Sequence, residues 1–189
     1  MTELGRLNRE YLRAPVRRKI LYVDDGFVQS GKAINISEGG ILLGELPHIP
    51  PINVIHMMID LPQFPDFHSL GSSRLSALKL QHLERKIIRI RARIVRSFEG
   101  KSEVEMAFKN IGCEFVDFKP EIKGEIEKYV SRYARNIIYM LMLFEHIGRK
   151  KEQIEELRNL CYLLGYNWTE KVPFLRQKIL HDYQSLESL

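Results

Sequence analysis

Two kinds of hydrophobic periodicity divide the chain near residue 119. Between residues 20 and 115, short apolar runs alternate with polar positions and are separated by turn-forming residues, which is the pattern of β-strands joined by turns. In 88–94, isoleucine or alanine occupies every second position and arginine the positions between, so one strand face is apolar and the other charged. Several short strands at regular spacing predict a small barrel or sandwich.

After Pro120 the apolar positions recur every three or four residues instead. Those of 122–144 lie on one face of a helix of roughly seven turns. Residues 150–164 repeat the pattern, and Pro173 suits the first turn of a third helix. We therefore expect an α+β protein in which a helical region, 119–189, follows the strands.

The segment 62–84 interrupts the strand pattern. Residues 62–73 are loop-like, whereas 75–83 fit either a short helix or the first strand of a hairpin. Strands are predicted on both sides of this segment, which therefore connects them.

The end of the long helix, residues 137–144, is apolar on all sides. Its eight residues cannot cross a bilayer, which needs about 20, so we expect no membrane span and a segment buried against protein. Either the two following helices cover it or a second subunit does. Because a small barrel and two short helices offer little cover, we expect a homo-oligomer formed through helix 121–147.

Composition is that of an ordinary globular protein, but its charge is concentrated at one end. The 189 residues carry a formal net charge of +5. Residues 1–20 contain six basic and two acidic residues, so they hold most of this excess and make an anionic partner plausible. The first residues lack the apolar run of a signal peptide, and two cysteines do not form a disulfide framework. We therefore expect a cytoplasmic protein.

Several kinds of chemistry lack the residues to carry them. The histidines and cysteines show no His-x-x-x-His or Cys-x-x-Cys spacing, which argues against a metal site. No nucleophile, base and acid can be grouped from the sequence, so we predict that the protein is not an enzyme. The arginines at 89, 91 and 93 have no aromatic residues between them, so nucleic-acid binding is not expected. A regulator that binds DNA through its basic surface would need an affinity that falls steeply with salt.

Two short motifs offer groups suited to a small anionic ligand. In Asn35-Ile36-Ser37-Glu38-Gly39-Gly40, an amide and a hydroxyl at alternate positions would share one face if the stretch is a strand, and two glycines let another group approach the backbone. The alternative is a hydrogen-bonded turn at the end of a strand, where Asn, Ser and Gly are favoured for local reasons. Upstream, Arg9 and Arg13 supply two guanidinium groups, each suited to phosphate oxygens or to the O6/N7 edge of guanine. Together these groups fit an anionic ligand that contains guanine.

These motifs resemble the two signatures of PilZ domains, which bind the bacterial second messenger cyclic di-GMP. Arg9-x-x-x-Arg13, followed by Ala14-Pro15-Val16, is similar to the first signature, and Asn35-x-Ser37-x-x-Gly40 to the second. Residues 94–96 and 111–115 resemble two later strands of the family, so the likeness extends from about residue 8 to 118. Family members usually have a shorter connection in place of 62–84, so the resemblance implies that this segment is an insertion. The resemblance implies a small antiparallel PilZ-type β-barrel over 20–118, between a basic N-terminal arm, 1–19, and the helical region, 119–189.

The resemblance also implies ligand contacts at the two motifs. Arg9 and Arg13 would clamp the guanine edges and phosphates of cyclic di-GMP. Asn35 and Ser37 would hydrogen-bond a guanine and the ribose-phosphate.

Three further positions are implied by the same resemblance. Gly40 would leave room for the ligand, and Arg96, at the end of a strand, would be an additional contact. In the family, the residue before the first arginine affects whether one or two ligand molecules bind, and here it is Asn8.

We therefore expect a cyclic di-GMP receptor of bacterial second-messenger signalling that needs no cofactor. Residues 1–19 carry no strand or helix pattern, so we expect the ligand to order this arm over the barrel and an unknown downstream protein to respond. The alternative is a PilZ-like oligomerising adaptor that acts through its C-terminal helices and does not depend on nucleotide.

Overall fold

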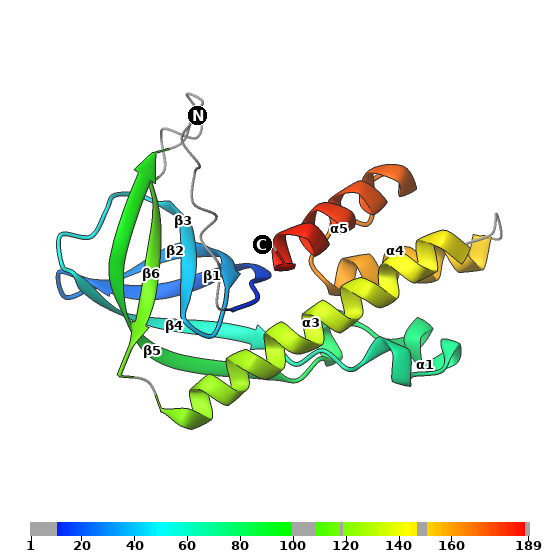
Figure 1. The fold of residues 1–189 in the computed structure, drawn as a ribbon, viewed down its shortest axis with the longest axis horizontal. Helices are drawn as coiled ribbons and strands as arrows, with labels where there is room; N and C mark the ends of the chain where they lie inside the picture. Colours follow the sequence, from blue (N-terminus) through cyan, green and yellow to red (C-terminus); the bar gives the residue numbers. More distant parts are fainter. Residues whose placement is uncertain (1–10, 100–108, 118, 147–150, 188–189) are drawn as a thin grey trace, which may run out of the picture.

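The computed structural model describes residues 11–99, 109–117, 119–146 and 151–187. They form a β-barrel at one end and a group of helices at the other, joined by one long helix (Figure 1). The strands are β1 Ala14–Asp24, β2 Phe27–Ile36, β3 Gly40–Leu46, β4 Val54–Pro62, β5 Arg85–Glu99 and β6 Lys109–Val116. The helices are α1 Ser72–Ala77, α3 Pro120–His146, α4 Lys151–Leu163 and α5 Val172–Glu187, with 3₁₀ turns η1 Phe67–Ser69 and η2 Leu80–His82.

The strands close into an antiparallel barrel in the order β1-β2-β3-β6-β5-β4, with β1 paired to β4. Alternation along β5 follows the sequence pattern. The side chains of Ile88, Ile90 and Ala92 are buried, whereas the arginines between them are exposed. Arg91 and Arg93 face Asp117 and Glu114, at 3.2 and 4.0 Å. The arginine row is therefore the outer face of a barrel strand, as its spacing predicts.

β1 begins at Ala14, inside the segment 1–19 that the sequence predicts to be without strand or helix, so this part of the prediction is wrong. Ala14 pairs with Ile36, and the register then shifts between Pro15 and Arg18. Arg17 adopts a left-handed backbone with φ of 50° at this bulge. The bulge accommodates a proline and consecutive charged residues, which hide the strand from a search for strict alternation.

Of the two interpretations of the second motif, the structure shows a turn at the end of a strand. β2 ends at Ile36, and residues 37–39 form a tight connection to β3. The backbone N–H of Ser37 donates to the carbonyl of Gly40 at 2.8 Å. Asn35 is therefore a strand residue and Ser37 a turn residue, because local turn bonding outweighs continued pairing at this point.

The insertion 62–84 is helical and packs among the C-terminal helices. No hairpin strand forms over 75–83. The helix α1 begins earlier, at Ser72 in the part predicted to be a loop, and covers only residues 75–77 of this range, whereas 80–82 form η2. The amide of Asn159 in α4 donates to the carbonyls of Leu78 and Leu75, at 3.0 and 3.5 Å. The backbone N–H of Gln63 donates to the carbonyl of Glu84 at 2.8 Å, which draws the two ends of the insertion together.

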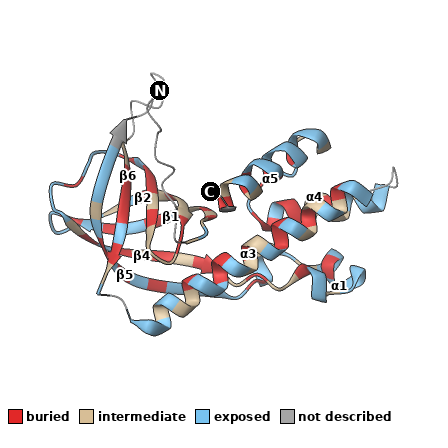
Figure 2. Cartoon of the chain, viewed as in Figure 1, coloured by how far each residue is buried: buried red, intermediate tan, exposed pale blue. Residues whose placement is uncertain are grey.

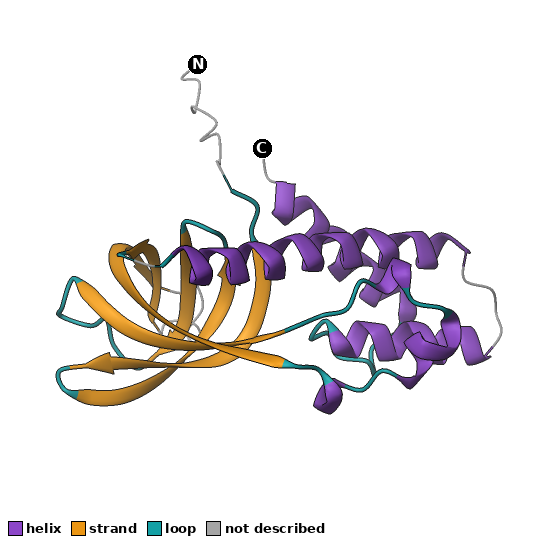
Figure 3. Cartoon of the chain, turned by 90° about the horizontal axis from the view of Figure 1, so that it is seen from below, coloured by secondary structure: helices purple, strands orange, loops and turns teal. Residues whose placement is uncertain are grey.

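The long helix predicted after Pro120 is α3, and it runs from the side of the barrel into the helical region (Figure 3). Buried residues recur along its length (Figure 2), and the helix contacts β1, η1, α4 and α5. The amide of Asn136, one of these buried residues, donates to the carbonyl of Pro65 at 3.0 Å and accepts from the N–H of Phe67 at 3.0 Å. Asn136 thus ties the insertion to the helical region.

The apolar end of α3 is buried on one side only. Ile137, Met140 and Phe144 are buried, as expected for a segment covered by protein. On the other side, Ile138 and Met142 are 45% and 50% exposed. No helix in the described part of the chain is both long and apolar enough to span a membrane.

Candidate functional site

One row of residues across five strands brings the sequence motifs together. Each step of this row is a direct pairing between neighbouring strands: Pro15 with Asn35, Asn35 with Leu42, Leu42 with Gly112, and Gly112 with Arg96. Directly paired residues of antiparallel strands present their side chains on the same face of the sheet. Because Arg96 is exposed, this face is the outside of the barrel. We call these five residues the outer row.

Gly112 lets Arg96 lie flat in the outer row. A side chain at Gly112 would place its Cβ 2.8 Å from Nε of Arg96 and 2.9 Å from its Cγ. The aliphatic stem of Arg96 therefore crosses the bare backbone of β6 towards β3. The structure thus brings Asn35 and Arg96, 61 positions apart in the sequence, to one exposed face.

The turn beside the outer row is held by Ser37 and Gly40. Besides its backbone bond, Ser37 donates its hydroxyl to the carbonyl of Gly40 at 3.3 Å, and its side chain is buried. A Cβ at Gly40 would lie 2.2 Å from the carbonyl oxygen of Cys113 in β6. The backbone of β6 therefore lies against Gly40, and a larger residue at this position would displace it.

The end of the N-terminal arm lies against this turn. The ring of Tyr11 lies 3.2 Å from the position of a Cβ on Gly39. Arg13 immediately precedes Ala14, which pairs with Ile36, so the chain delivers Arg13 beside Ser37. The ends of both motifs therefore meet at one corner of the barrel. Arg9 and Asn8 lie outside the described residues.

The long helix adds a cation to the same corner. Lys123 of α3 lies 3.7 Å from the carboxylate of Glu38 and 5.8 Å from the centre of the Tyr11 ring. Sequence reasoning missed both Tyr11 and Lys123. Tyr11 sits between the two motif arginines, where an aromatic residue in a charged arm is a usable signal, whereas nothing in the helical pattern singles out Lys123.

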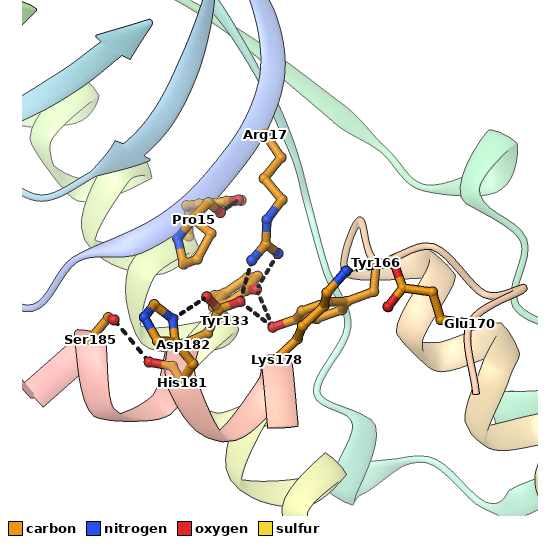
Figure 4. Close-up of polar contacts among 10 residues, drawn as sticks. Pro15, Arg17, Tyr133, Tyr166, Glu170, Lys178, His181, Asp182 and Ser185 are labelled. Atoms are coloured by element: carbon orange, nitrogen blue, oxygen red, sulfur yellow. Dashed lines mark hydrogen bonds and ion pairs between the residues drawn. The ribbon is translucent and has the colours of Figure 1, made fainter. Parts of the chain in front are cut away.

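Four residues beyond Arg13, a second arginine is directed into the protein (Figure 4). Arg17 forms a salt bridge with Asp182 of α5, and its guanidinium lies 4.5 Å from the centre of the Tyr166 ring. Asp182 is 7% exposed and also accepts a hydrogen bond from the hydroxyl of Tyr166. Tyr133 of α3 completes the group, with its hydroxyl 3.2 Å from that of Tyr166 and 3.4 Å from Arg17 Nη1. We call these four residues the junction cluster.

The junction cluster fixes the helices to the start of the barrel. Burial raises the pKa of Tyr133 to about 12 and also raises the pKa of Tyr166. Both hydroxyls therefore keep their protons at neutral pH and remain hydrogen-bond donors. One turn earlier in α3, Tyr129 donates to the carbonyl of Pro15 at 2.7 Å. The same stretch of β1 that leads from the arm is therefore bonded to α3 and α5.

The outer row and its corner offer binding groups rather than reactive ones. Burial raises the pKa of the Cys113 thiol to about 12, so this cysteine is a core residue, as its alternation with Phe115 predicts. Among the described residues, no three His, Cys, Asp or Glu side chains come close enough to hold a metal ion. The carboxylates nearest the corner, Glu38 and Glu114, face Lys123 and Arg93. The arrangement suits an anionic ligand on the exposed face.

Comparisons with known proteins show a similarity in fold but none in sequence families. No protein-family model and no curated protein matches the sequence. Among solved structures, the inhibitor of motility MotI (DgrA) of Bacillus subtilis is similar over 69% of this chain and 52% of its own, with a TM-score of 0.50 and 14% identity. The predicted fold class, a small antiparallel barrel followed by helices, is confirmed.

Two further solved structures contain cyclic di-GMP. The PilZ domain of Escherichia coli YcgR with c-di-GMP is similar over 68% of this chain and 92% of its own, with a TM-score of 0.40 and 13% identity. The K. pneumonia MrkH–c-di-GMP complex is similar over 73% and 54%, with a TM-score of 0.43 and 14% identity. The chain spans about half the length of MotI and MrkH.

Proposed function

We propose that this protein is a cyclic di-GMP receptor that binds the nucleotide on the outer row and at the corner beside it. The main support for the proposal is that the two motifs lie next to each other in the fold. The Tyr11 ring packs on Gly39, and the pairings of β2, β3, β6 and β5 carry Asn35 and Arg96 to one exposed face. Residues from distant parts of the sequence that resemble one family's ligand contacts thus gather on a single surface.

The chemistry of these residues matches the ligand. Cyclic di-GMP carries two phosphate charges and two guanine bases. The Arg13 guanidinium can form paired hydrogen bonds to a phosphate or to the O6/N7 edge of guanine. Asn35 supplies an amide that both donates and accepts, and Arg96 supplies a second planar cation. Arg9 would complete the clamp, and Asn8 would bear on whether one or two nucleotides bind.

Ser37 and Gly40 have an indirect part in this proposal. Their mutual hydrogen bonds set the shape of the turn, so they position Gly39 under the arm. The hydroxyl of Ser37 has a second lone pair and remains able to accept from a ligand. A nucleotide held between the turn and the arm would order the arm over the barrel and change the charge of that face, which a downstream protein could recognise.

Calorimetric titration of the full chain with cyclic di-GMP tests the proposal. Wild-type protein should bind, and Arg13→Ala should lose about ten- to hundredfold in affinity because a charge-assisted contact is removed. Arg13→Lys should also bind poorly, since a point charge lacks the planar fork.

Arg89→Ala is the matched control, because Arg89 is an exposed arginine of the barrel that lies outside the outer row. It should bind as wild type does. Equal affinity of Arg13→Ala and Arg89→Ala, or no heat with wild type at the highest attainable nucleotide concentration, would overturn the proposal.

A second function, assembly through the C-terminal helices, is favoured by the exposed side of α3. Ile138 and Met142 are one turn apart and present apolar surface beside an otherwise packed helix end. A homo-oligomer through helix 121–147 would cover them. Light scattering should then show that Ile138→Glu with Met142→Glu reduces the molar mass in solution without loss of helical circular dichroism. A monomeric wild type at high concentration would end this proposal.

A further inference from the structure

A basic pocket lies where the insertion meets α4, apart from the outer row. We call it the second pocket. Its volume is about 380 Å³, within the roughly 300–1,000 Å³ range typical of small-molecule sites. It is formed by β1, by η2 and the residues before it, by the start of β5, and by α4. The polar and aromatic residues that line it are Arg18, Lys79, Gln81, Arg85, Asn159 and Tyr162.

The charge of this pocket is positive and largely uncompensated. Among the residues that the structure describes, no carboxylate lines it. Arg85 is bonded to Asp60, with its Nε 3.0 Å from a carboxylate oxygen. Within the described ranges, Arg18 and Lys79 form no ion pair. Two cations that no internal acid neutralises therefore remain for an anion.

The bulge in β1 explains why Arg18 is available. In a regular strand Arg17 and Arg18 would point to opposite faces. The left-handed backbone of Arg17 and the register shift up to Arg18 break that alternation, and both residues line one cavity on the helical side of the barrel. Arg17 is paired with Asp182 in a salt bridge, whereas Arg18 borders the second pocket. One local distortion thus supplies both a structural arginine and a binding arginine.

The walls of the pocket are held in place by internal bonds. Asn159 donates to the carbonyl of Leu78, directly before Lys79, which fixes this part of the insertion to α4. One turn later in α4, Tyr162 borders the same pocket with 44% of its surface exposed. An aromatic ring at the rim of a basic pocket provides a stacking surface for a planar group.

We propose that this pocket binds a nucleotide, with the phosphate between Arg18 and Lys79 and the base against Tyr162. The site is separate from the outer row, because Arg18 lies beyond the bulge and faces the helical region, so the inference does not rest on the proposed cyclic di-GMP site. It also gives the insertion a role that the barrel motifs do not explain. Stacking tolerates any base, so the phosphate and a planar ring define the ligand class.

Titration of the full chain with 5′-AMP, adenosine and inorganic phosphate tests the inference, because adenine avoids the guanine-selective contacts of the outer row. 5′-AMP should bind more tightly than either of its parts, and its affinity should fall as salt is raised. Arg18→Gln and Lys79→Gln should each weaken 5′-AMP by about tenfold. Tyr162→Leu should weaken 5′-AMP but leave phosphate unaffected.

Two controls separate this site from its surroundings. Lys19→Gln removes a charge from the neighbouring exposed position that does not line the pocket, and should bind 5′-AMP as wild type does. Arg13→Ala should also bind 5′-AMP normally, even though it loses cyclic di-GMP. Absence of 5′-AMP binding by wild type, or unchanged binding by the Arg18→Gln/Lys79→Gln double variant, would overturn the inference.

Discussion

Arg13 and Arg17 lie four residues apart in one stretch of chain, are both half-buried, and lie beside different parts of the protein. Arg13 precedes the first strand and lies beside the turn at Ser37. Arg17 lies at the bulge and turns inwards to Asp182 and Tyr166. The bulge is the boundary between them. On one side an arginine lies next to the outer row, and on the other the same residue type holds barrel and helices together.

This contrast shows how one short segment can serve both binding and structure. A receptor face needs cations whose charge a ligand can neutralise, whereas a junction needs cations that are already neutralised. Because Pro15 is bonded to Tyr129 and paired with Asn35, the two environments are fixed relative to each other. Changes on the outer row and changes in the junction cluster should therefore have separable effects, on affinity and on stability respectively.

Breaking the junction cluster should give the largest loss of stability. Asp182→Ala leaves the Arg17 guanidinium, whose side chain is 30% exposed, without its carboxylate. We expect the free energy of unfolding to fall by about 3 kcal/mol, because a buried charge loses its partner. Urea unfolding followed by circular dichroism measures this directly.

The exposed pair Lys32–Glu45 provides the control for that experiment. Its atoms are 2.7 Å apart, but its side chains are 41% and 57% exposed. Glu45→Ala should therefore cost no more than about 1 kcal/mol. If Asp182→Ala and Glu45→Ala lower the urea midpoint equally, the junction cluster contributes no more to stability than an exposed ion pair does.

Alanine substitutions at two glycines on neighbouring strands should distinguish an effect on stability from an effect on binding. Both effects should be smaller than that of Asp182→Ala. In Gly40→Ala the new methyl group would lie 2.2 Å from a backbone carbonyl, which cannot move freely, so we expect a loss of about 1–3 kcal/mol in stability. In Gly112→Ala the methyl group would meet the flexible Arg96 side chain at 2.8 Å, which can move away.

Gly112→Ala should accordingly leave the free energy of unfolding within about 1 kcal/mol of wild type, while weakening cyclic di-GMP because Arg96 is displaced. Thermal unfolding and calorimetric titration of both variants make the comparison. A Gly112→Ala protein with wild-type affinity would remove Arg96 from the proposed site.

Strands and the long helix could be predicted because their patterns are local, whereas the choice of a barrel rested on the family resemblance. Apolar residues occupy every second position in 88–94 and every third or fourth position in 122–144. Each pattern arises because a single element buries one face. The start of β1 could not be predicted in the same way. Its bulge breaks the alternation, and pairing with β2 together with bonding to α3 and α5 stabilises Ala14–Arg18 as strand.

Motif resemblance names residues of the candidate site but not their arrangement. It singles out Asn35 and Arg96, yet only strand order makes them members of one row. The packing of Gly40 could not be predicted, because its close neighbour, Cys113, belongs to a strand that is distant in sequence. Lys123 was missed for the same reason, since its place beside Glu38 depends on how α3 packs.

Hydrogen exchange with and without cyclic di-GMP tests the central claim most directly, because it reports both sides of the bulge in one measurement. Saturating nucleotide should slow exchange in residues 11–16, 33–41 and 94–97, where the arm, the turn and the outer row lie. Exchange in α4 should stay as it is without ligand. Protection confined to α4 and the insertion, or no change anywhere at saturating nucleotide, would contradict the assignment of the outer row as the cyclic di-GMP site.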